Sequence, residues 1–382
     1  MLMSTYQAPL GYVSLNTLET HMKYLNKRSL VATALIAPLA LFGLANNAAA
    51  GESTESTIYT QTNATAGNQI LAFQNVNGVL TATGAYSTGG LGSGNGLGSQ
   101  GAIVTSDHRL VAVNAGSNQV SLFTISSNGA LKLRSVASSN GVRPISVTVH
   151  DDLVYVVNGS SRNVTGFRID DNQLAPIAGS TQALPGNGAA QISFDNDGMR
   201  LVVAEKATNS LDVLPVSVNG VTGAAVSNPS TGQTPFGFAI DKSNHVIVSN
   251  AAGGAAGASS LSSYSFAGAT GLAPISSAVA STQSAACWVA LSADSKFAYS
   301  TNTGSGTISS YTVRNDGTLT LLKAVALSPG SGPLDMVTVG RSVFTLAGAA
   351  HTISVAAIGS TGALTGGSGV PVPTGVVGLA AS

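Results

Sequence analysis

Three residue types that could do chemistry are rare in this chain and fall at or beside one recurring position of its repeats. Trp288 is the only Trp, Cys287 is the only Cys, and Glu205 is the only Glu after residue 55. A carboxyl group beside an indole can take a raised pKa through desolvation and act as a general acid or base. Cys287 has no neighbouring His to activate a thiolate, so a small buried residue is the simplest interpretation of it.

The elements that must position these residues belong to a unit that recurs seven times. Each copy has a strand-like apolar run, a turn of small residues and a second strand, and copies are 44 to 52 residues apart. The copies begin at Ile58, Leu110, Val154, Leu201, Val246, Phe297 and Val343. A period of this length made only of strand signals predicts a seven-bladed β-propeller with four-stranded antiparallel blades.

The two ends of the repeat region predict how the ring closes. Residues 374–381 resemble an inner strand with no second strand after it, and residues 58–63 resemble a second strand with no inner strand before it. We therefore expect the C-terminal strand to complete the N-terminal blade, which removes the open sheet edges.

Aligning the predicted inner strands indicates which side chains surround the axis. Glu205 and Lys206 stand where most blades have an Asn and a small residue, and departures from a repeat often mark function. One hypothesis is that Glu205 forms an ion pair with a Lys or Arg that braces the central channel. The other is a small-ligand site with Glu205, Gln191 and Asp335 as its catalytic residues and a surrounding ligand-binding set. That set is Trp288, Cys287, Arg143, Lys206, Gln100 and Phe236.

Several of these residues have a second, structural interpretation. Trp288 can plug the channel or provide a stacking surface, and Arg143 can be a cation for a ligand or a solvated rim residue. The recurring turn asparagines are expected to be structural, because Asn tolerates a positive φ and bonds its own backbone in tight turns. They are Asn63, Asn114, Asn158, Asn250 and Asn302. The Gly-rich segments 89–101 and 251–258 lack the Lys and the strand–loop–helix setting of a phosphate loop, so we expect long connections on a propeller face.

The first fifty residues read as a separate targeting segment. Lys23, Lys27 and Arg28 precede an apolar stretch from Leu30 to Leu44, and residues 48–50 are three alanines. This order is typical of a secretory signal peptide, with residues 1–21 a possible upstream extension. The apolar stretch is short for a membrane span, which needs ~20 residues. We expect the propeller to occupy residues 51–382, with a periplasmic or extracellular location and no membrane span after cleavage.

Composition limits the partners. The leader holds three of the 16 Lys and Arg and one of the 16 Asp and Glu, which leaves the propeller with a net charge of −2. No basic face is therefore expected for nucleic acid. The His residues lack metal-ligand spacing, so neither metal nor cofactor is expected. A monomer that binds a small molecule or a protein at one propeller face is the expectation.

One repeat consists of an inner strand, an Asp-Gly turn and the stretch from Leu201 to Val213, LVVAEKATNSLDV. This repeat resembles the lactonase-type seven-bladed propellers. That family includes phosphogluconolactonase and carboxymuconate cyclase. The resemblance implies that Arg, His and Glu surround an axial cleft. Glu205 matches the Glu, but Ala190 and Gln191 stand where the Arg and His would be.

The absence of this Arg and His determines which functions we expect. Gln191 cannot exchange protons near neutral pH, and Ala190 carries no charge to hold a phosphate or carboxylate. Phosphogluconolactonase activity is therefore disfavoured. The leading hypothesis is an exported propeller with a degenerate active site that binds a ligand or partner. The alternatives are a hydrolase or cycloisomerase acting on a lactone or unsaturated carboxylic acid, and a structural or adhesive protein without an axial ligand.

Overall fold

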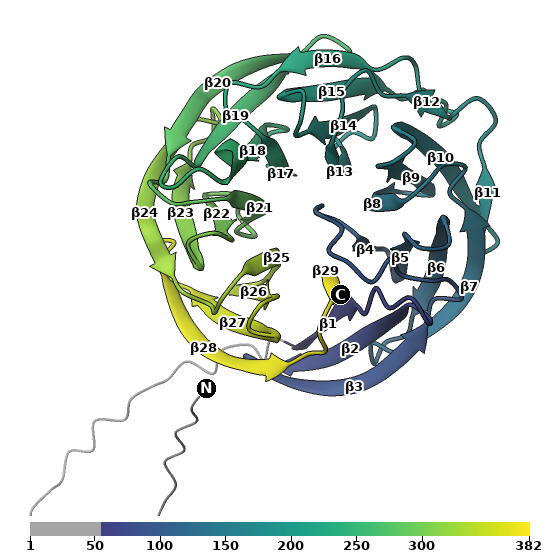
Figure 1. Ribbon diagram of the computed structural model, residues 1–382, viewed down its shortest axis with the longest axis horizontal. Coiled ribbons are helices and arrows are strands. Elements are labelled where there is room, and N and C mark those ends of the chain that lie inside the picture. The colour runs from purple at the N-terminus through teal and green to yellow at the C-terminus, as the bar shows by residue number, and fades with distance from the viewer. Residues whose placement is uncertain (1–54) are drawn as a thin grey trace, which may run out of the picture. The chain divides into compact units, whose positions relative to one another are not determined.

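In the computed structural model, which describes residues 55–382, each sequence repeat contributes to a blade of four antiparallel strands. Seven such blades surround a central axis (Figure 1). The predicted fold class is therefore confirmed. The first blade is ordered β29-β1-β2-β3, and each later blade runs outward from its innermost strand in chain order.

The strands of the first four blades are as follows. Blade 1 contains β29 (Val377–Ala381), β1 (Glu55–Gln61), β2 (Gln69–Val76) and β3 (Val79–Ser87). Blade 2 contains β4 (Ile103–Ser106), β5 (Arg109–Asn114), β6 (Gln119–Ile125) and β7 (Leu131–Ser138). Blade 3 contains β8 (Pro144–His150), β9 (Leu153–Asn158), β10 (Asn163–Asp170) and β11 (Gln173–Pro176), and the short β12 (Gln182–Ala183) also pairs with β10. Blade 4 contains β13 (Ala189–Phe194), β14 (Arg200–Glu205), β15 (Ser210–Pro215) and β16 (Val226–Pro229).

The remaining blades complete the circle. Blade 5 contains β17 (Pro235–Ile240), β18 (Val246–Asn250), β19 (Ser260–Ala267) and β20 (Gly271–Ala280), with a 3₁₀ turn η1 (Ala252–Gly254) between β18 and β19. Blade 6 contains β21 (Ala286–Leu291), β22 (Phe297–Asn302), β23 (Thr307–Val313) and β24 (Leu319–Leu327). Blade 7 contains β25 (Pro333–Val339), β26 (Ser342–Ala347), β27 (Thr352–Ile358) and β28 (Leu364–Pro371).

The hydrophobic core lies between blades that stack face to face. Second strands such as β9 and β14 are apolar on both faces and buried along almost their whole length, whereas outer strands such as β3 are largely exposed. Buried tyrosines tie neighbouring blades, because their rings fill the interface and their hydroxyls reach a turn of the next blade. Tyr59 Oη donates to the Gly129 carbonyl at 2.8 Å and Tyr299 Oη to the Gly362 carbonyl at 3.1 Å.

Ring closure follows the prediction from the chain ends. β29 pairs antiparallel with β1, with Ile58 opposite Ala381 and Tyr59 opposite Ala380. Thr60 Oγ1 adds a hydrogen bond of 2.7 Å to the Gly378 carbonyl. Figure 1 shows the C-terminal strand, in yellow, as the innermost strand of the blade that begins the ring in purple. The last strand thus removes the two free edges that an open propeller would have.

The turn asparagines are structural for a different reason from the one predicted. Of the five, only Asn63 has a positive φ, of 49°. The other four are fully or almost fully buried, and their side-chain amides bond to other parts of the chain. Asn114 Nδ2 donates to Ser121 Oγ at 2.7 Å, and Asn302 Nδ2 donates to Ser309 Oγ at 2.8 Å. Asn114, Asn250 and Asn302 thus join the second strand to the third strand of their blades, whereas Asn158 Nδ2 donates to the Ser139 carbonyl in the connection before β8.

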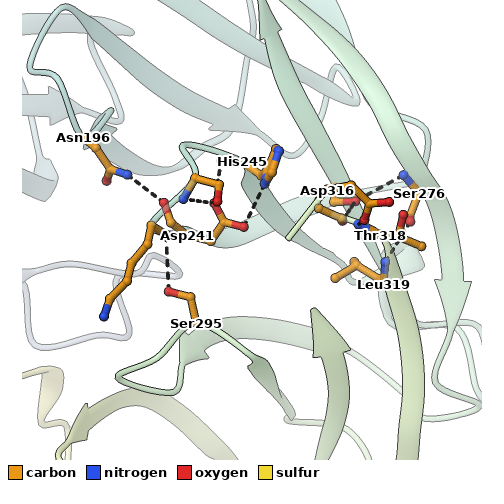
Figure 2. A network of polar contacts seen from close by, with 12 residues as sticks. Asn196, Asp241, His245, Ser276, Ser295, Asp316, Thr318 and Leu319 are labelled. Atoms are coloured by element: carbon orange, nitrogen blue, oxygen red, sulfur yellow. Dashed lines mark hydrogen bonds and ion pairs between the residues drawn. The ribbon is translucent and has the colours of Figure 1, made fainter. Parts of the chain in front are cut away.

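The inner hairpin turns are held by aspartate and by contacts between blades. Asp241 Oδ1 accepts the backbone amides of Ser243 and His245, and its Oδ2 lies 2.9 Å from His245 Nδ1 (Figure 2). Asn196 Nδ2 from blade 4 donates to the Asp241 carbonyl at 2.7 Å. The similar Asp195 turn has both carboxylate oxygens occupied by Met199 and Arg200 groups of its own blade, as expected for a turn. These hydrogen bonds hold the hairpin turns between the inner and second strands in place.

The predicted leader, residues 1–50, lies outside the described residues, so it stays a prediction. Within residues 55–382 we find no helix with the length and hydropathy to cross a membrane.

Candidate functional site

Backbone bulges aim the predicted axial residues. The pairing of inner and second strands shifts register between Ala189 and Gln191, between Ala286 and Val289, and between Pro333 and Met336. The shifts place Ala190, the Cys287–Trp288 pair and the Leu334–Asp335 pair at irregular points near the start of their strands. Bulges of this kind re-aim side chains next to functional sites. Their positions could not be read from the alternation of the sequence.

A segment of the chain itself covers one end of the axis. Residues 95–100, here called the axial strap, belong to the Gly-rich connection between β3 and β4, which reaches into the centre of the ring (Figure 1). Arg143 Nη2 donates to the Leu97 carbonyl at 3.2 Å, and Lys206 Nζ donates to the Gly98 carbonyl at 2.5 Å. Trp288 Nε1 donates to the Ser99 carbonyl at 3.0 Å. Donors from three blades therefore hold three successive carbonyls of the strap.

Phe236 joins this cluster through its ring. Its centroid lies 5.0 Å from that of Trp288, and Lys206 Nζ lies 4.7 Å from the Phe236 centroid. Such a cation–π contact is favourable when water is excluded. Burial lowers the pKa of Lys206, and the nearby Arg143 charge lowers it further. Four of the predicted ligand-binding residues, Arg143, Lys206, Phe236 and Trp288, thus surround the chain's own strap.

The two glutamines of the predicted site act as struts between blades. Gln191 Nε2 donates to the Phe238 carbonyl at 2.9 Å, and its Oε1 accepts the Phe238 amide at 2.6 Å. Gln100 makes the same two-way contact with Val289, at 2.8 and 3.0 Å. Both ends of each side-chain amide are therefore engaged with backbone. Each amide keeps one N–H and one lone pair beyond these bonds, and both residues line a cavity of about 230 Å³, so the catalytic role of Gln191 stays a prediction.

Asp335 lines two cavities on the axis, one together with Trp288 and the strap and the other together with Gln191 and Gln100. It is 3% exposed, and the two cavities have volumes of about 250 Å³ and about 230 Å³ respectively. Its Oδ2 has no hydrogen-bond partner. Burial raises the pKa of Asp335 to about 8, although backbone amides of Gly101, Met336 and Leu379 act in the opposite direction. The raised pKa favours the uncharged form of this carboxyl group near neutral pH.

Glu205 lies next to Gln191 in the sheet, because Gln191 is paired with Ala204, but Glu205 does not line the cavities that Asp335 lines. It ends β14, is 1% exposed and lines neither axial cavity. Its side chain lies under Gly186, where an added Cβ would come within 2.5 Å of Glu205 Cγ and 3.0 Å of Asp212 Oδ2. Burial and the neighbouring Asp212 raise the pKa of Glu205 to about 8, against opposing effects of Arg162 and Lys206. No ion pair joins Glu205 to Lys206 within residues 55–382, so the bracing pair is not formed either.

Cys287 is buried, as expected for a small packing residue. It is 8% exposed, and burial raises the pKa of its thiol to about 11. A thiol with a raised pKa carries little thiolate at neutral pH and is a poor nucleophile. In the part of the chain that the structure describes, no three His, Cys, Asp or Glu side chains are grouped so as to hold a metal ion.

Two features of the site were missed by sequence reasoning. The first is the axial strap, whose Gly-rich composition indicated a surface connection but not a path across the axis. The second is Asp212, the carboxyl partner of Glu205. A signal for Asp212 was present, because the third strands of blades 2, 5 and 6 have Ser121, Ser262 and Ser309 at the corresponding position.

Comparison with known proteins agrees with this geometry. Residues 52–178 match the family model of the lactonase, 7-bladed beta-propeller family. The 6-phosphogluconolactonases of Yersinia enterocolitica and Yersinia pestis are 26% identical to this chain over 144 residues, which is 35% of this chain and 43% of each relative. The match to this family lies within residues 52–178, and the seven-bladed fold that the family model describes is the fold of this chain.

Solved structures extend the likeness in fold to most of the chain. A putative 6-phosphogluconolactonase from Bacteroides uniformis superposes with a TM-score of 0.71 at 17% identity, covering 86% of this chain and 99% of that one. The periplasmic gluconolactonase of Pseudomonas aeruginosa superposes with a TM-score of 0.63 at 16% identity, covering 85% and 99%. At these identities the likeness establishes the fold. The curated sequence relatives are matched over less than half of their own length, so their activity does not transfer with the match.

Proposed function

We propose that this protein is an exported lactonase-type propeller that binds a small uncharged ligand in its axial cavity and does not hydrolyse phosphorylated lactones. The observation that carries the proposal is the position of its axial cations. Arg143 and Lys206 donate to carbonyls of the axial strap. An anionic substrate would have to displace the strap before it could use either charge.

The groups that remain available support a neutral ligand. Asp335 lines the cavity, its buried Oδ2 has no hydrogen-bond partner among residues 55–382, and a pKa raised to about 8 favours the protonated carboxyl at neutral pH. Trp288 and Leu334 supply apolar surface to the same cavity of about 250 Å³. A protonated carboxyl donates one hydrogen bond and accepts others. It therefore suits a compact molecule with an oxygen acceptor better than a phosphate or carboxylate.

Fluorescence of the single tryptophan tests the proposal. Glucono-1,5-lactone, gluconate and 6-phosphogluconate would be titrated against the purified protein while Trp288 emission and the melting temperature are followed. We expect the neutral lactone to change the emission and to raise the melting temperature, because a ligand at 100 times its Kd stabilises by about 2.7 kcal/mol. Asp335→Asn should weaken this response, and the two anions should give none.

A measurement of substrate turnover distinguishes an enzyme from a binding protein. A hydrolase or cycloisomerase is favoured by one observation, namely that the protonated Asp335 carboxyl beside an enclosed cavity could act as a general acid. Lactone opening followed by NMR, with Asp335→Asn as the control, separates the two. Hydrolysis of 6-phosphogluconolactone that Asp335→Asn abolishes would overturn the binding proposal. Binding of the neutral lactone without turnover would support it.

A further inference from the structure

A polar cleft lies away from the axis, at the junction where the ring closes. It has a volume of about 580 Å³ and lies between blades 1 and 2, beside the end of β29. Its walls come from β1, β2, the β4–β5 turn and the β6–β7 turn. We call it the seam cleft. Its volume falls within the ~300–1,000 Å³ range of small-molecule sites.

The position of Thr57 in β1 is occupied by larger side chains in two other blades. The register of β1 with β2, β9 with β10 and β22 with β23 makes Thr57 the counterpart of Leu153 and Phe297. Leu153 and Phe297 each press against a turn glycine of the next blade, Gly220 and Gly362, so closely that an added Cβ would come within 2.5 Å of them. In blade 1 the shorter Thr57 takes this place, and a Cβ added at Gly129 would come within 2.0 Å of Thr57 Oγ1. The smaller side chain is a departure from the pattern of these blades, and such departures often mark function.

The lining of the seam cleft is rich in hydroxyl groups. Seven Ser and Thr residues and Gln74 contribute to its walls. Several of these hydroxyls already have a partner in the chain, such as Thr105 Oγ1, which donates to the Ala381 carbonyl, and Ser126 Oγ, which donates to the Ala130 carbonyl, so a ligand would use their remaining lone pairs. Thr57 Oγ1 and Gln74 Oε1 are 3.4 Å apart, a long contact that leaves most of their hydrogen-bonding capacity for another group. Hydroxyl and amide groups both donate and accept. Such a surface is complementary to a ligand that is itself covered with hydroxyls.

The charges of the seam cleft exclude anions. Glu55, Asp107 and His108 line it, and their side chains make no hydrogen bond or ion pair with residues 55–382. Neither Lys nor Arg lines it. Free carboxylates accept hydrogen bonds from ligand hydroxyls, and such charge-assisted bonds are the stronger kind. The same carboxylates repel a phosphate, a sulfate or a uronic acid.

We propose that the seam cleft is a binding site for an uncharged saccharide of one or two sugar units. The hydroxyl-lined walls hold the ring hydroxyls, and Asp107 and Glu55 accept hydrogen bonds at the rim. This site shares no lining residue with the cavity beside Trp288, to which the axial proposal refers, although it shares Thr105 and Ala381 with the cavity beside Gln191. Its failure and the failure of the axial proposal are therefore independent.

Saturation-transfer NMR with neutral disaccharides tests the site. Maltose, cellobiose and N,N′-diacetylchitobiose would be compared with the acidic digalacturonate. We expect at least one neutral disaccharide to bind with a Kd of about 1 mM or tighter, and digalacturonate to bind at least about tenfold more weakly. Thr57→Phe, which restores the wedge found in blade 6, should fill the cleft and weaken the neutral ligand about tenfold or more. Ser342→Phe changes the counterpart position of blade 7 and should leave binding unchanged.

A second variant covers the case in which Thr57→Phe does not fold. Asp107 has a φ of 44°, which Asn also tolerates, so Asp107→Asn should keep the turn. It should weaken the neutral disaccharide and narrow the discrimination against digalacturonate, which a purely structural Asp would not do. Three results would each overturn the proposal: no binding by any of the three neutral sugars, binding unaffected by both variants, or a response to Ca²⁺ alone.

Discussion

Glu205 and Asp212 form a buried carboxyl pair at the place where other blades pair an Asn with a Ser. In blades 2, 5 and 6 an Asn amide at the end of the second strand donates to a Ser hydroxyl on the third strand at 2.7 to 2.9 Å. In blade 4 both positions are acids, and Glu205 Oε2 and Asp212 Oδ1 have no partner. Burial raises the pKa of both groups. The Asp212 charge is a cause of the raised Glu205 pKa, and neighbouring carboxyl groups that interact in this way can titrate together.

The pair should make stability fall as pH rises. The pKa of Glu205 is about 8 in the folded protein against 4.5 unfolded, so the folded state binds more protons between those values and unfolding becomes easier across that window. Glu205→Gln removes the ionisation and supplies a donor to Asp212. We expect the variant to be more stable at pH 8 by a few kcal/mol, on the order of 1.4 kcal/mol per pKa unit, with a smaller difference below pH 4.5.

Calorimetric melting at several pH values measures this effect. Asn302→Asp is the matched converse, because it places a carboxyl at the same position of blade 6 beside Ser309. The Asn302→Asp variant should lose stability as the pH becomes alkaline, and this loss should be larger than that of the parent protein. A Glu205→Gln protein whose melting temperature follows the same pH curve as the parent would show that the pair holds no extra proton.

The axial strap should control the exposure of Trp288. The indole is 7% exposed and is covered through its bond to the Ser99 carbonyl. Lys206→Ala removes the bond to Gly98 and the contact with Phe236, so the strap should open more often. We expect acrylamide to quench Trp288 emission about two- to fivefold more strongly in this variant, since a lost charge-assisted bond is worth ~1.5–3 kcal/mol. Lys242→Ala, which changes an exposed Lys of the rim, should not alter quenching.

Removal of the C-terminal strand should destabilise the whole ring. Deletion of residues 373–382 exposes the edge of β1 and removes the buried Val376, Val377 and Leu379. Each buried aliphatic side chain contributes about 1.5–3 kcal/mol, so the loss should be on the order of 5 kcal/mol or more. Thermal melting and the yield of soluble protein report it. A truncated protein that melts like the intact one would contradict closure by β29.

Cys287 should be inert in the folded protein. Its thiol is buried and its pKa is raised to about 11. We expect no reaction with Ellman's reagent at pH 8 in the native state and reaction of one thiol per chain in denaturant. Rapid labelling of the native protein would indicate that blade 6 opens locally or that the thiol is activated.

Much of the fold could be predicted because its signals are local. The strand pattern repeats along the chain, and each blade forms from neighbouring segments, so Ile58, Leu110 and Val154 predicted their strands without any distant contact. Closure by residues 377–381 followed from counting strands at the two ends. The axial position of Asp335 and Trp288 also followed, because a register shared by seven copies places equivalent residues at the hub.

The chemistry of the site was decided by contacts between distant segments. Trp288 and Gln100 are bonded to residues 189 positions away in the chain, and Lys206 to one 108 positions away. No local pattern specifies the path of a Gly-rich connection, whose backbone is free to turn in many directions. The sequence alone determined a ring of seven blades and the residues near its axis. Only the tertiary structure decided that the strap occupies their donors, that Glu205 pairs with Asp212, and that Asp335 lines two axial cavities.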